Sequence, residues 1–424
     1  MRTKTGIKIF ITVLALILGL LLTGCAREAA PEQEPAQEPT PVQEPAVEEP
    51  TPVTIRVGLW GSEEELNASL ENAQGADSMF PGLTVEIQPF PSSEDFWSNL
   101  PAQIAAKTAP DIVKLTNEGA FEFIEKGLFV PIDNYVADAG LDLGTFAQSA
   151  KDIWTVDENL YGIPKSVMPA MFIINQDMWD EAGLGEPPTT WDEVREAART
   201  LTQGDTKGII INLHEFHLTN WILTFGGGWG NGRTINSDAN VQALETIIEF
   251  YDEGLAITPK QAGFGWDGEV FANLRGAMST GGWWYKGYLA TAAPDINATF
   301  IPMPMGTTRG STSHSDAYVV LKDAVDRVSA VKAAYWLTRD EALESIMERV
   351  GINPAKPALA SKFYEVNPEF AAIEAMVPYS KDFGYPADTR NFNLLLVQAM
   401  EEKILGGTDI TVREILDSIQ EEFN

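Results

Sequence analysis

Three stretches near the start of the compact part of the chain alternate apolar and polar positions, a pattern typical of β-strands. They cover residues 53–60, 83–90 and 109–117, with helix-forming segments between them. The order strand, helix, strand, helix, strand predicts an α/β layer with a mainly parallel sheet. Ligands bind beyond the carboxyl ends of such strands, so the segments "WGSEE" and "TNEGA" are the first candidates for a binding site.

The middle of the chain carries three helical patterns. The one at residues 189–204 places Thr190 three residues before Glu193, the spacing of a capping box, and its apolar residues fall on one face. Residues 237–254 and 324–338 follow the same plan. No repeat of fixed period occurs, so we do not expect a solenoid or a propeller.

The first 25 residues predict a lipoprotein signal peptide. Three basic residues precede an apolar run of 14 residues, which fits a signal peptide. It is shorter than the ~20 residues that a membrane span needs. The run leads into "LTGC", which resembles a bacterial lipobox, and Cys25 is the only cysteine of the chain. The resemblance implies a signal peptide over residues 1–24 and a lipid on Cys25. The alternative is a plain signal peptide with a chance cysteine.

Composition changes sharply after Cys25. Residues 26–52 contain seven prolines and seven glutamates in 27 positions, which cannot bury a core and favour an extended spacer. We therefore interpret residues 25–52 as a lipid-anchored linker that tethers a soluble globular part. The net charge is −32, and it becomes −35 without residues 1–24 and their three positive charges. Such a surface repels nucleic acid and anionic lipid headgroups, so neither is expected as a partner.

Several kinds of chemistry are disfavoured by the sequence. A single cysteine permits no internal disulfide and no CxxC metal site. The segment "HEFH" spaces its histidines at i and i+3, whereas the zinc-protease motif needs i and i+4. No P-loop, GxSxG elbow or EF-hand loop is present. We therefore expect no catalytic residues, no cofactor and no metal.

The order of segments resembles the family 1 extracellular solute-binding proteins of bacterial ABC importers, the carbohydrate-binding group that includes maltose-binding protein. The most specific match is "FIINQDMWDEAGLGEPPTTWDEVREAARTLT". The segments "FIEKGLFVPIDNYV", "NLYGIPKSV" and "FANLRGAMSTGGWW" also resemble family motifs, in the family's order. The resemblance extends over most of the chain after the linker.

The resemblance implies an α/β fold of two lobes, joined by a hinge, with a ligand cleft between them. It places residues 53–163 and about 300–353 in the first lobe, and residues 164–299 and about 354–424 in the second. Closure of such lobes on a solute is a hinge motion, and the closed form would dock on an ABC permease. We expect a monomer outside the cytoplasm, held at the membrane by its lipid alone.

Sugar recognition needs flat aromatic faces for the C–H faces of the ring and polar groups for its hydroxyls. The chain has 11 tryptophans. We expect Trp97, Trp154, Trp179, Trp191 and Trp336 to pack in the core. Several others lie beside glycine in predicted loops and are candidate ligand contacts, and core packing is the alternative for each; they are Trp60, Trp221, Trp229, Trp283 and Trp284. By resemblance, Trp283 is the residue that stacks on sugar.

The polar candidates come from the ends of predicted strands and from the last part of the chain. Ser62 follows the first strand, and Asn117 and Glu118 follow the third. Lys165 follows the predicted crossing between lobes, and Arg390 lies in "PADTRNFN". For each, a solvated loop residue is the alternative.

Taken together, these features predict a lipid-anchored protein that captures a carbohydrate, either an oligosaccharide or a glycoside, and delivers it to an ABC permease without chemistry. Two alternatives remain. An anchored glycoside hydrolase would need two carboxylates across a cleft, and with 61 acidic residues the sequence does not exclude such a pair. A lipoprotein that senses a ligand for a receptor would share the same fold and site.

Overall fold

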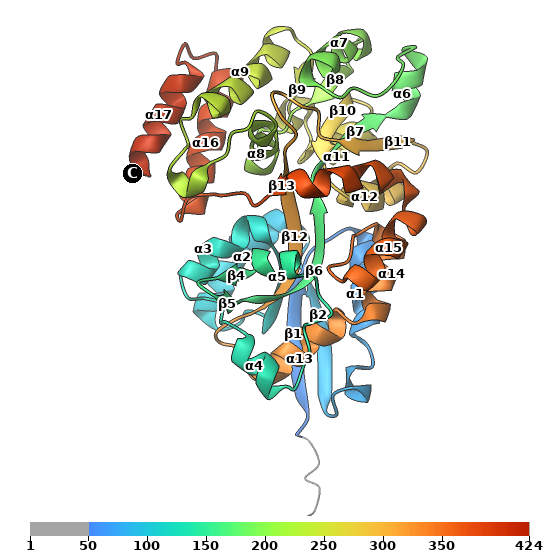
Figure 1. Cartoon of the computed structure of the whole chain (residues 1–424), viewed down its shortest axis with the longest axis vertical. Coiled ribbons are helices and arrows are strands. Elements are labelled where there is room, and N and C mark those ends of the chain that lie inside the picture. Colours follow the sequence, from blue (N-terminus) through green and yellow to red (C-terminus); the bar gives the residue numbers. More distant parts are fainter. Residues whose placement is uncertain (1–50, 424) are drawn as a thin grey trace, which may run out of the picture. The chain divides into compact units, whose positions relative to one another are not determined.

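The computed structural model describes residues 51–423 (Figure 1). Cys25, the signal peptide and most of the linker lie outside these residues. In the described part, no helix is long and apolar enough to cross a membrane. Contacts join residues 50–424 into one compact unit, and within it the strands form two main sheets.

The first sheet confirms the three predicted strands. β1 (Val53–Leu59) pairs in parallel with β2 (Leu83–Pro89) and with β3 (Ile112–Thr116). The later strand β12 (Ser311–Val320) pairs antiparallel with β3 and with β6 (Gly162–Pro169). The helices in the chain segments of this sheet are α1 (Glu63–Ala73), α2 (Ser93–Ala106), α3 (Asn117–Glu125), α4 (Asp133–Asp138), α5 (Gln148–Ile153), α13 (Arg327–Leu337) and α14 (Asp340–Val350).

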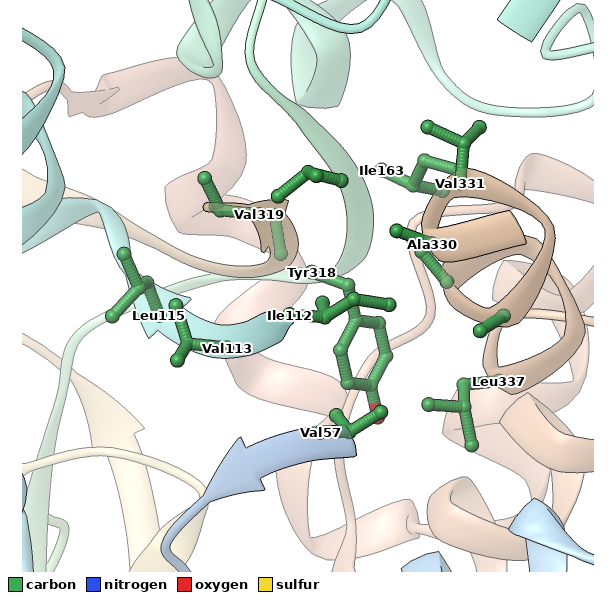
Figure 2. Close-up of a cluster of buried hydrophobic side chains, with 14 of the residues drawn as sticks. Val57, Ile112, Val113, Leu115, Ile163, Tyr318, Val319, Ala330, Val331 and Leu337 are labelled. Atoms are coloured by element: carbon green, nitrogen blue, oxygen red, sulfur yellow. The ribbon is translucent and has the colours of Figure 1, made fainter. Parts of the chain in front are cut away.

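Apolar side chains of these strands and of α13 form the core of the first lobe. In Figure 2 the ring of Tyr318 lies among Val57, Ile112 and Leu337. All four side chains are buried. The apolar positions that predicted β1 therefore lie on a face of the sheet that a helix covers. This is the arrangement expected of an α/β layer.

The second sheet is built from strands between residues 171 and 302. Its order is β11–β7–β10–β8–β9. The strands are β7 (Met171–Asn175), β8 (Lys207–Ile210), β9 (Ala256–Ile257), β10 (Gly276–Gly281) and β11 (Ala298–Pro302). The helices of this lobe are α6 (Gln176–Glu181), α7 (Trp191–Leu201), α8 (Glu215–Thr224), α9 (Asp238–Asp252), α10 (Pro259–Ala262), α11 (Asp267–Ala272), α12 (Trp284–Ala292), α16 (Thr389–Ile404) and α17 (Val412–Glu422).

Local sequence signals account for several of these helices. α7 begins at the predicted capping box, in which Thr190 accepts from the Glu193 backbone and the Glu193 carboxylate accepts from Thr190. Its predicted apolar face is buried. The patterns at 237–254 and 324–338 form α9 and α13. A satisfied cap contributes ~1 kcal/mol to helix stability, while the buried face fixes the helix on its sheet.

Three chain segments lie side by side where the lobes join. β6 runs up to Pro169, and the backbone N–H of Ala170 donates to Thr312 in β12 at 3.1 Å. The short strand β13 (Ser380–Lys381) pairs in parallel with Ser311 and Thr312. The connection between the lobes is therefore a paired set of strands, which restricts relative motion of the lobes to bending about this point.

The structure gives the local context of the two crossings between lobes that were expected at about residues 300 and 353. Residues 298–302 belong to the second sheet as β11, so the return to the first lobe comes after residue 302. Pro354 still bridges to Ser166, and α15 (Pro357–Val366) packs on α14, so the final departure also comes later than residue 353. The 3-10 segment η3 (Pro368–Tyr379) then packs against β11. Beyond it, α16 packs against α17, which lies beside α9 (Figure 1).

Candidate functional site

The two lobes meet where α3 of the first lobe faces α8 of the second. Glu118 lies in the first turn of α3, and His214 is the N-cap of α8. The Nδ1 atom of His214 is 3.7 Å from Glu118 Oε1 and 3.6 Å from Glu215 Oε2. One carboxylate from the first lobe and one from the second thus share a single imidazole. We call Glu118, Glu215 and Asp382 the boundary carboxylates.

Asn117 connects this boundary to two other segments. Its Nδ2 donates to the Ser313 carbonyl at 3.0 Å and to Asp382 Oδ1 at 3.2 Å, and its Oδ1 accepts from the Ser315 backbone at 2.9 Å. The side chain is buried. Every amide atom is therefore engaged within the protein, so Asn117 orients Asp382 and β12 and is not poised to bind a hydroxyl in this conformation.

The boundary carboxylates surround the hydroxyl of Tyr385. Burial raises the pKa of this phenol well above its usual value, and Glu118, Glu215 and Asp382 each add to the increase. Burial also raises the pKa of Glu118 to about 7; His214 opposes that increase and Glu215 adds to it. Three acids close enough to act on one phenol produce a strongly negative site.

An aromatic surface adjoins these acids. Phe216 follows Glu215 in the chain and contacts Trp284 with ring centroids 5.3 Å apart. Phe383 follows Asp382 and stacks on Tyr385 at 5.2 Å. His314 of β12 completes the set, 5.2 Å from Trp284 and 5.9 Å from Phe216. We call Phe216, Trp284, His314, Phe383 and Tyr385 the aromatic wall.

The adjacent tryptophans take different roles. Trp283 is 3% exposed and packs in the second lobe, with its ring 4.8 Å from that of His314. Trp284 begins α12 and stays partly exposed. The two rings meet edge to face at 5.3 Å. Trp284, rather than Trp283 as the resemblance implied, therefore offers accessible ring surface, while Trp283 supports it from behind.

The candidates after β1 lie across the boundary from α12. Ser62 caps α1 by accepting from the Glu65 backbone N–H at 3.2 Å. Its hydroxyl also lies close to Gly287 of α12, where an added Cβ would come within 3.2 Å of Ser62 Oγ. Trp60 is partly buried against Phe96 at 4.5 Å, with the Lys114 ammonium over its ring at 4.8 Å. The structure therefore gives Ser62 a capping role and Trp60 a packing role, and both face the boundary only in part.

Lys165 belongs to a buried ionic network. Its side chain has no exposed surface, and its Nζ lies 2.6 Å from Glu65 Oε1. Lys114 binds the same oxygen at 3.2 Å and lies 3.9 Å from Asp316 Oδ2. Burial opposes the charge of Glu65, but the two lysines outweigh it and lower the pKa of Glu65 to about 2. Lys165 is thus an internal counterion in this conformation and not a free group in a cleft.

Two of the candidate ligand contacts are fully buried in this conformation. Trp221 and Trp229 both have 0% exposure in the core of the second lobe. Trp221 stacks on Trp191 with centroids 3.4 Å apart, and Trp229 donates its indole N–H to Thr219 at 2.8 Å. A ring covered on both faces by protein atoms offers no surface to a sugar. The glycines beside these tryptophans indicated a loop, which does not specify the side on which the ring packs.

Arg390 is the last polar candidate, and five tryptophans were expected to pack in the protein interior. Arg390 is exposed in the first turn of α16, and no ion pair joins it to another described residue. The five tryptophans expected to pack do so. Four are buried and Trp97 is partly buried against the core of the first lobe; the buried ones are Trp154, Trp179, Trp191 and Trp336.

A second polar network lies beneath the aromatic wall. His217 Nδ1 is 2.6 Å from Thr280 Oγ1, and His217 Nε2 is 3.2 Å from Asp267 Oδ1. This order of hydroxyl, imidazole and carboxylate matches that of a nucleophile with its base. All three side chains are buried, however, and Asp267 also accepts from Tyr285 at 2.5 Å and from Asn212 at 2.8 Å. The network therefore supports the floor of the wall and presents no accessible nucleophile.

Sequence reasoning missed most of the second lobe's contribution. Glu215, Phe216 and His214 lie within "HEFH", which was considered only as a zinc motif. Phe383 and Tyr385 lie in "KDFGYP", just before the segment that contains Arg390. The available signal was the alternation of acid and aromatic residues in both segments, because paired acids and flat rings together are typical of a binding surface.

Glu118, His214 and Glu215 bring their candidate ligand atoms within 4.8 Å of one another, close enough in principle to hold a metal ion. His214 Nδ1, the nitrogen that faces both carboxylates, also accepts from the Phe216 backbone N–H at 3.3 Å. A metal at this nitrogen would displace that helix cap. The donor set therefore fits a metal poorly.

Two cavities lie away from the boundary. One of ~210 Å³ is in the first lobe and is lined by residues that include Arg56, Lys107 and Lys322. The other, of ~160 Å³, is in the second lobe beside Thr258 and Glu401. Neither includes a boundary carboxylate or a residue of the aromatic wall.

Two α/β lobes joined by crossing strands, with acids and aromatic rings between them, define a two-lobed binding protein of the periplasmic type. The family model of the bacterial extracellular solute-binding proteins matches residues 60–344, and the chain belongs to this family.

Relatives and solved structures agree with this assignment. A putative binding protein of Brucella abortus is 21% identical over 312 residues, which cover 70% of this chain and 75% of the relative. An ABC substrate-binding protein from Listeria monocytogenes, solved with cycloalternan, has a TM-score of 0.79 and 22% identity, covering 88% of this chain and 98% of that one. A solute-binding protein from Thermotoga lettingae, solved with α-D-tagatose, has a TM-score of 0.78, 20% identity and the same coverage.

Proposed function

We propose that this chain is a lipid-anchored solute-binding protein that captures a carbohydrate between its lobes and delivers it to an ABC permease. The observation that carries the proposal is the aromatic wall beside the boundary carboxylates, at the junction of two lobes. Ring faces suit the C–H faces of a pyranose, and carboxylates accept hydrogen bonds from its hydroxyls. Two similar proteins, solved with cycloalternan and with α-D-tagatose, support a sugar as the solute class.

Closure of the lobes is the step that converts binding into transport. Glu118 and His214 approach each other across the boundary, and Asn117 reaches Asp382 from the opposite lobe. A solute placed between these groups would exchange such contacts for contacts with itself. Because only a ligand that prefers the closed state shifts the lobes toward it, the solute would bridge residues of both lobes. The closed form would then present the surface that the permease recognises.

A glycoside hydrolase is a second candidate because one specific pair of acids favours it. Oxygens of Glu118 and Glu215 lie within 4.8 Å of each other, and the pKa of Glu118 is raised to about 7. Retaining glycosidases place two carboxyl groups ~5 Å apart, one of them with a raised pKa. Here, however, the two acids belong to different lobes and approach only across the boundary. We therefore propose binding without chemistry.

The test is isothermal calorimetry of the purified protein against mono- and oligosaccharides, with mass analysis of the recovered sugar. We expect saturable binding and an intact sugar. Trp284→Ala should weaken binding about tenfold, since ring contacts contribute ~1 kcal/mol and the cavity adds to the loss. Trp266→Ala is the matched control, because Trp266 is also half-buried and its ring contacts Tyr285 and Tyr288, neither of which belongs to the wall.

Three outcomes would revise the proposal. A sugar recovered cleaved would identify an enzyme. Equal losses in both tryptophan variants would show that Trp284 acts through stability alone. No binding of any sugar would exclude carbohydrates of the panel as solutes, while the family assignment would stand.

A further inference from the structure

The boundary carboxylates lack basic partners. Within residues 51–423, ion pairs join Glu118 and Glu215 to His214 and to no lysine or arginine. Asp382 accepts from the neutral amide of Asn117 and takes part in no ion pair of the described residues. A carboxylate out of water is costly unless it is paired. Glu118 and Glu215, whose side chains are 17% and 18% exposed, therefore leave an excess of negative charge that a neutral sugar would not balance, and the exposed Asp382 lies beside them.

One oxygen in this cluster accepts no hydrogen bond, because the nearest charged group, His214 Nδ1 at 3.7 Å, already accepts the Phe216 N–H. Glu118 Oε1 is fully buried and accepts no hydrogen bond, although the side chain as a whole is 17% exposed. Buried polar atoms in native proteins are nearly always paired. This oxygen therefore lacks the donor that it would have in a complete complex.

A second, independent observation lies in the aromatic wall. His314 is only 6% exposed, and its Nδ1 is buried without a hydrogen-bond partner. Its ring lies against Trp284 and within 6.5 Å of the Phe383 centroid. Burial lowers the pKa of His314 to about 4; Asp316 opposes this effect and Lys114 adds to it. A neutral imidazole beside four aromatic rings is a group that a polar ligand atom can pair without adding positive charge.

The rings beside the acids suit an organic cation better than a metal ion. Phe216 and Phe383 directly follow Glu215 and Asp382 in sequence and are buried, so the accessible ring surface near the carboxylates comes from Trp284 and Tyr385, which are partly exposed. A cation over such rings gains ~0.5–2 kcal/mol. A divalent metal would need His214 Nδ1, which already accepts the Phe216 N–H. An ammonium has three N–H donors and can reach two or three carboxylates at once.

We propose that the boundary carboxylates bind the ammonium of an amino sugar, so that the solute is a positively charged saccharide. The inference rests on the proposed function and makes its substrate class specific. The ammonium would lie between Glu118 of the first lobe and Glu215 of the second. The positive charge of the ammonium then balances the negative charge of the boundary carboxylates, and the sugar ring lies against the aromatic wall.

The experiment compares amino sugars with their hydroxyl and N-acetyl counterparts. Glucosamine, galactosamine and the β-1,4-linked glucosamine disaccharide are each titrated by calorimetry near pH 7 beside the parent sugar and the N-acetylated form. At least one amino sugar should bind ten- to a hundredfold more tightly than both counterparts. A charge-assisted hydrogen bond contributes ~1.5–3 kcal/mol, which corresponds to that range.

Three variants identify the groups involved. Glu118→Gln and Glu215→Gln keep the shape of the side chain and remove its charge, so each should abolish most of the preference for the amino sugar. Affinity for the parent sugar should also fall, because the same carboxylates accept from its hydroxyls, but by less than affinity for the amino sugar, so the ratio of the two affinities reports the charge. Glu86→Gln removes an exposed acid of β2 and should leave the preference unchanged. Thermal unfolding of each variant confirms that it is folded.

The outcomes test binding of an amino sugar separately from the proposed function. Tight binding of a parent or N-acetylated sugar with no advantage for the amine overturns the inference and leaves the proposed function standing. No binding by any sugar overturns both. Saturable binding of Zn²⁺ that is lost in Glu118→Gln and competes with no amino sugar assigns the cluster to a metal and overturns the inference.

Discussion

The protein contains two groups of poorly exposed acids that differ in their counterions. Inside the first lobe, Glu65 is held by Lys114 and Lys165, and Asp316 also lies within reach of Lys114. At the lobe boundary, Glu118 and Glu215 have only a shared imidazole. The inner network balances two acids with two lysines, whereas the boundary has an excess of acid.

The pKa values of the two groups distinguish charges that stabilise the fold from charges that could serve a function. The inner lysines lower the pKa of Glu65 to about 2, while burial without a strong cation raises that of Glu118 to about 7. Charges that neutralise one another within the chain stabilise it and require no ligand. Charges left unbalanced at a boundary that moves are available to a solute.

The largest expected effect comes from breaking the inner network. Lys165→Met removes a fully buried cation and leaves Glu65 short of a partner, which should lower the free energy of unfolding by ~3–5 kcal/mol. Glu118→Gln, the matched change at the boundary, should cost less than ~1 kcal/mol at pH 7, because no buried cation loses its partner. Urea unfolding of both variants checks this. Similar losses in the two would mean that the boundary acids are also structural.

The next largest expected effect is on the pH dependence of stability, to which Glu118 and His314 contribute with opposite signs. Glu118 keeps its proton in the folded state up to a pKa of about 7, whereas the unfolded value is 4.5. Its contribution to the free energy of unfolding therefore falls between pH 4.5 and 7, by up to ~3 kcal/mol. His314 has a folded pKa of about 4 against 6.5, so its contribution rises between pH 4 and 6.5.

These two dependences oppose each other between pH 4.5 and 6.5, which makes the variants informative. The unmodified protein should show a shallow pH profile there. Glu118→Gln should become more stable as the pH rises, because only the His314 dependence remains; His314→Phe should become less stable. Glu65 adds a loss of stability only below pH 4.5. Urea unfolding at half-unit pH intervals measures the slopes, and unchanged slopes in both variants would contradict the assignments.

The smallest effect is expected at Arg390. This side chain is exposed and has no ion-pair partner among the described residues. Arg390→Ala should change stability by less than ~0.5 kcal/mol, and affinity for any bound sugar by less than twofold. A calorimetric titration beside the Glu118 variants checks this. A loss of tenfold or more would show that Arg390 reaches the solute and that the boundary has a cation after all.

Local signals were sufficient to predict much of the fold. Alternation predicted β1, β2 and β3, and the Thr190 capping box predicted the start of α7. These features depend on residues close in sequence, for which period and capping chemistry are reliable guides. The positions of β11 and α15 depend instead on pairing with distant strands and helices, which a local pattern does not specify.

The candidate site was only partly predictable because distant segments build it. Asn117 and Glu118 were found from the end of a strand, but Asp382 meets Asn117 across 265 positions. Nothing in the segment around Asp382 specifies that encounter. The burial of Trp221 and Trp229 was not predictable for a related reason. The residues that cover their rings come from other parts of the chain, which a local pattern does not include.

The place of β12 in the first sheet sets an order for folding. This strand lies between β3 and β6 and pairs with both. A chain that emerges N-terminus first has therefore made all five strands of the second sheet, residues 171–302, before the first sheet can be completed. Pairing across such a long interval closes a large loop and is slow compared with local contacts. The sheet that begins the compact unit is thus completed after the second sheet, and until then β3 and β6 have unpaired edges that need protection from other chains.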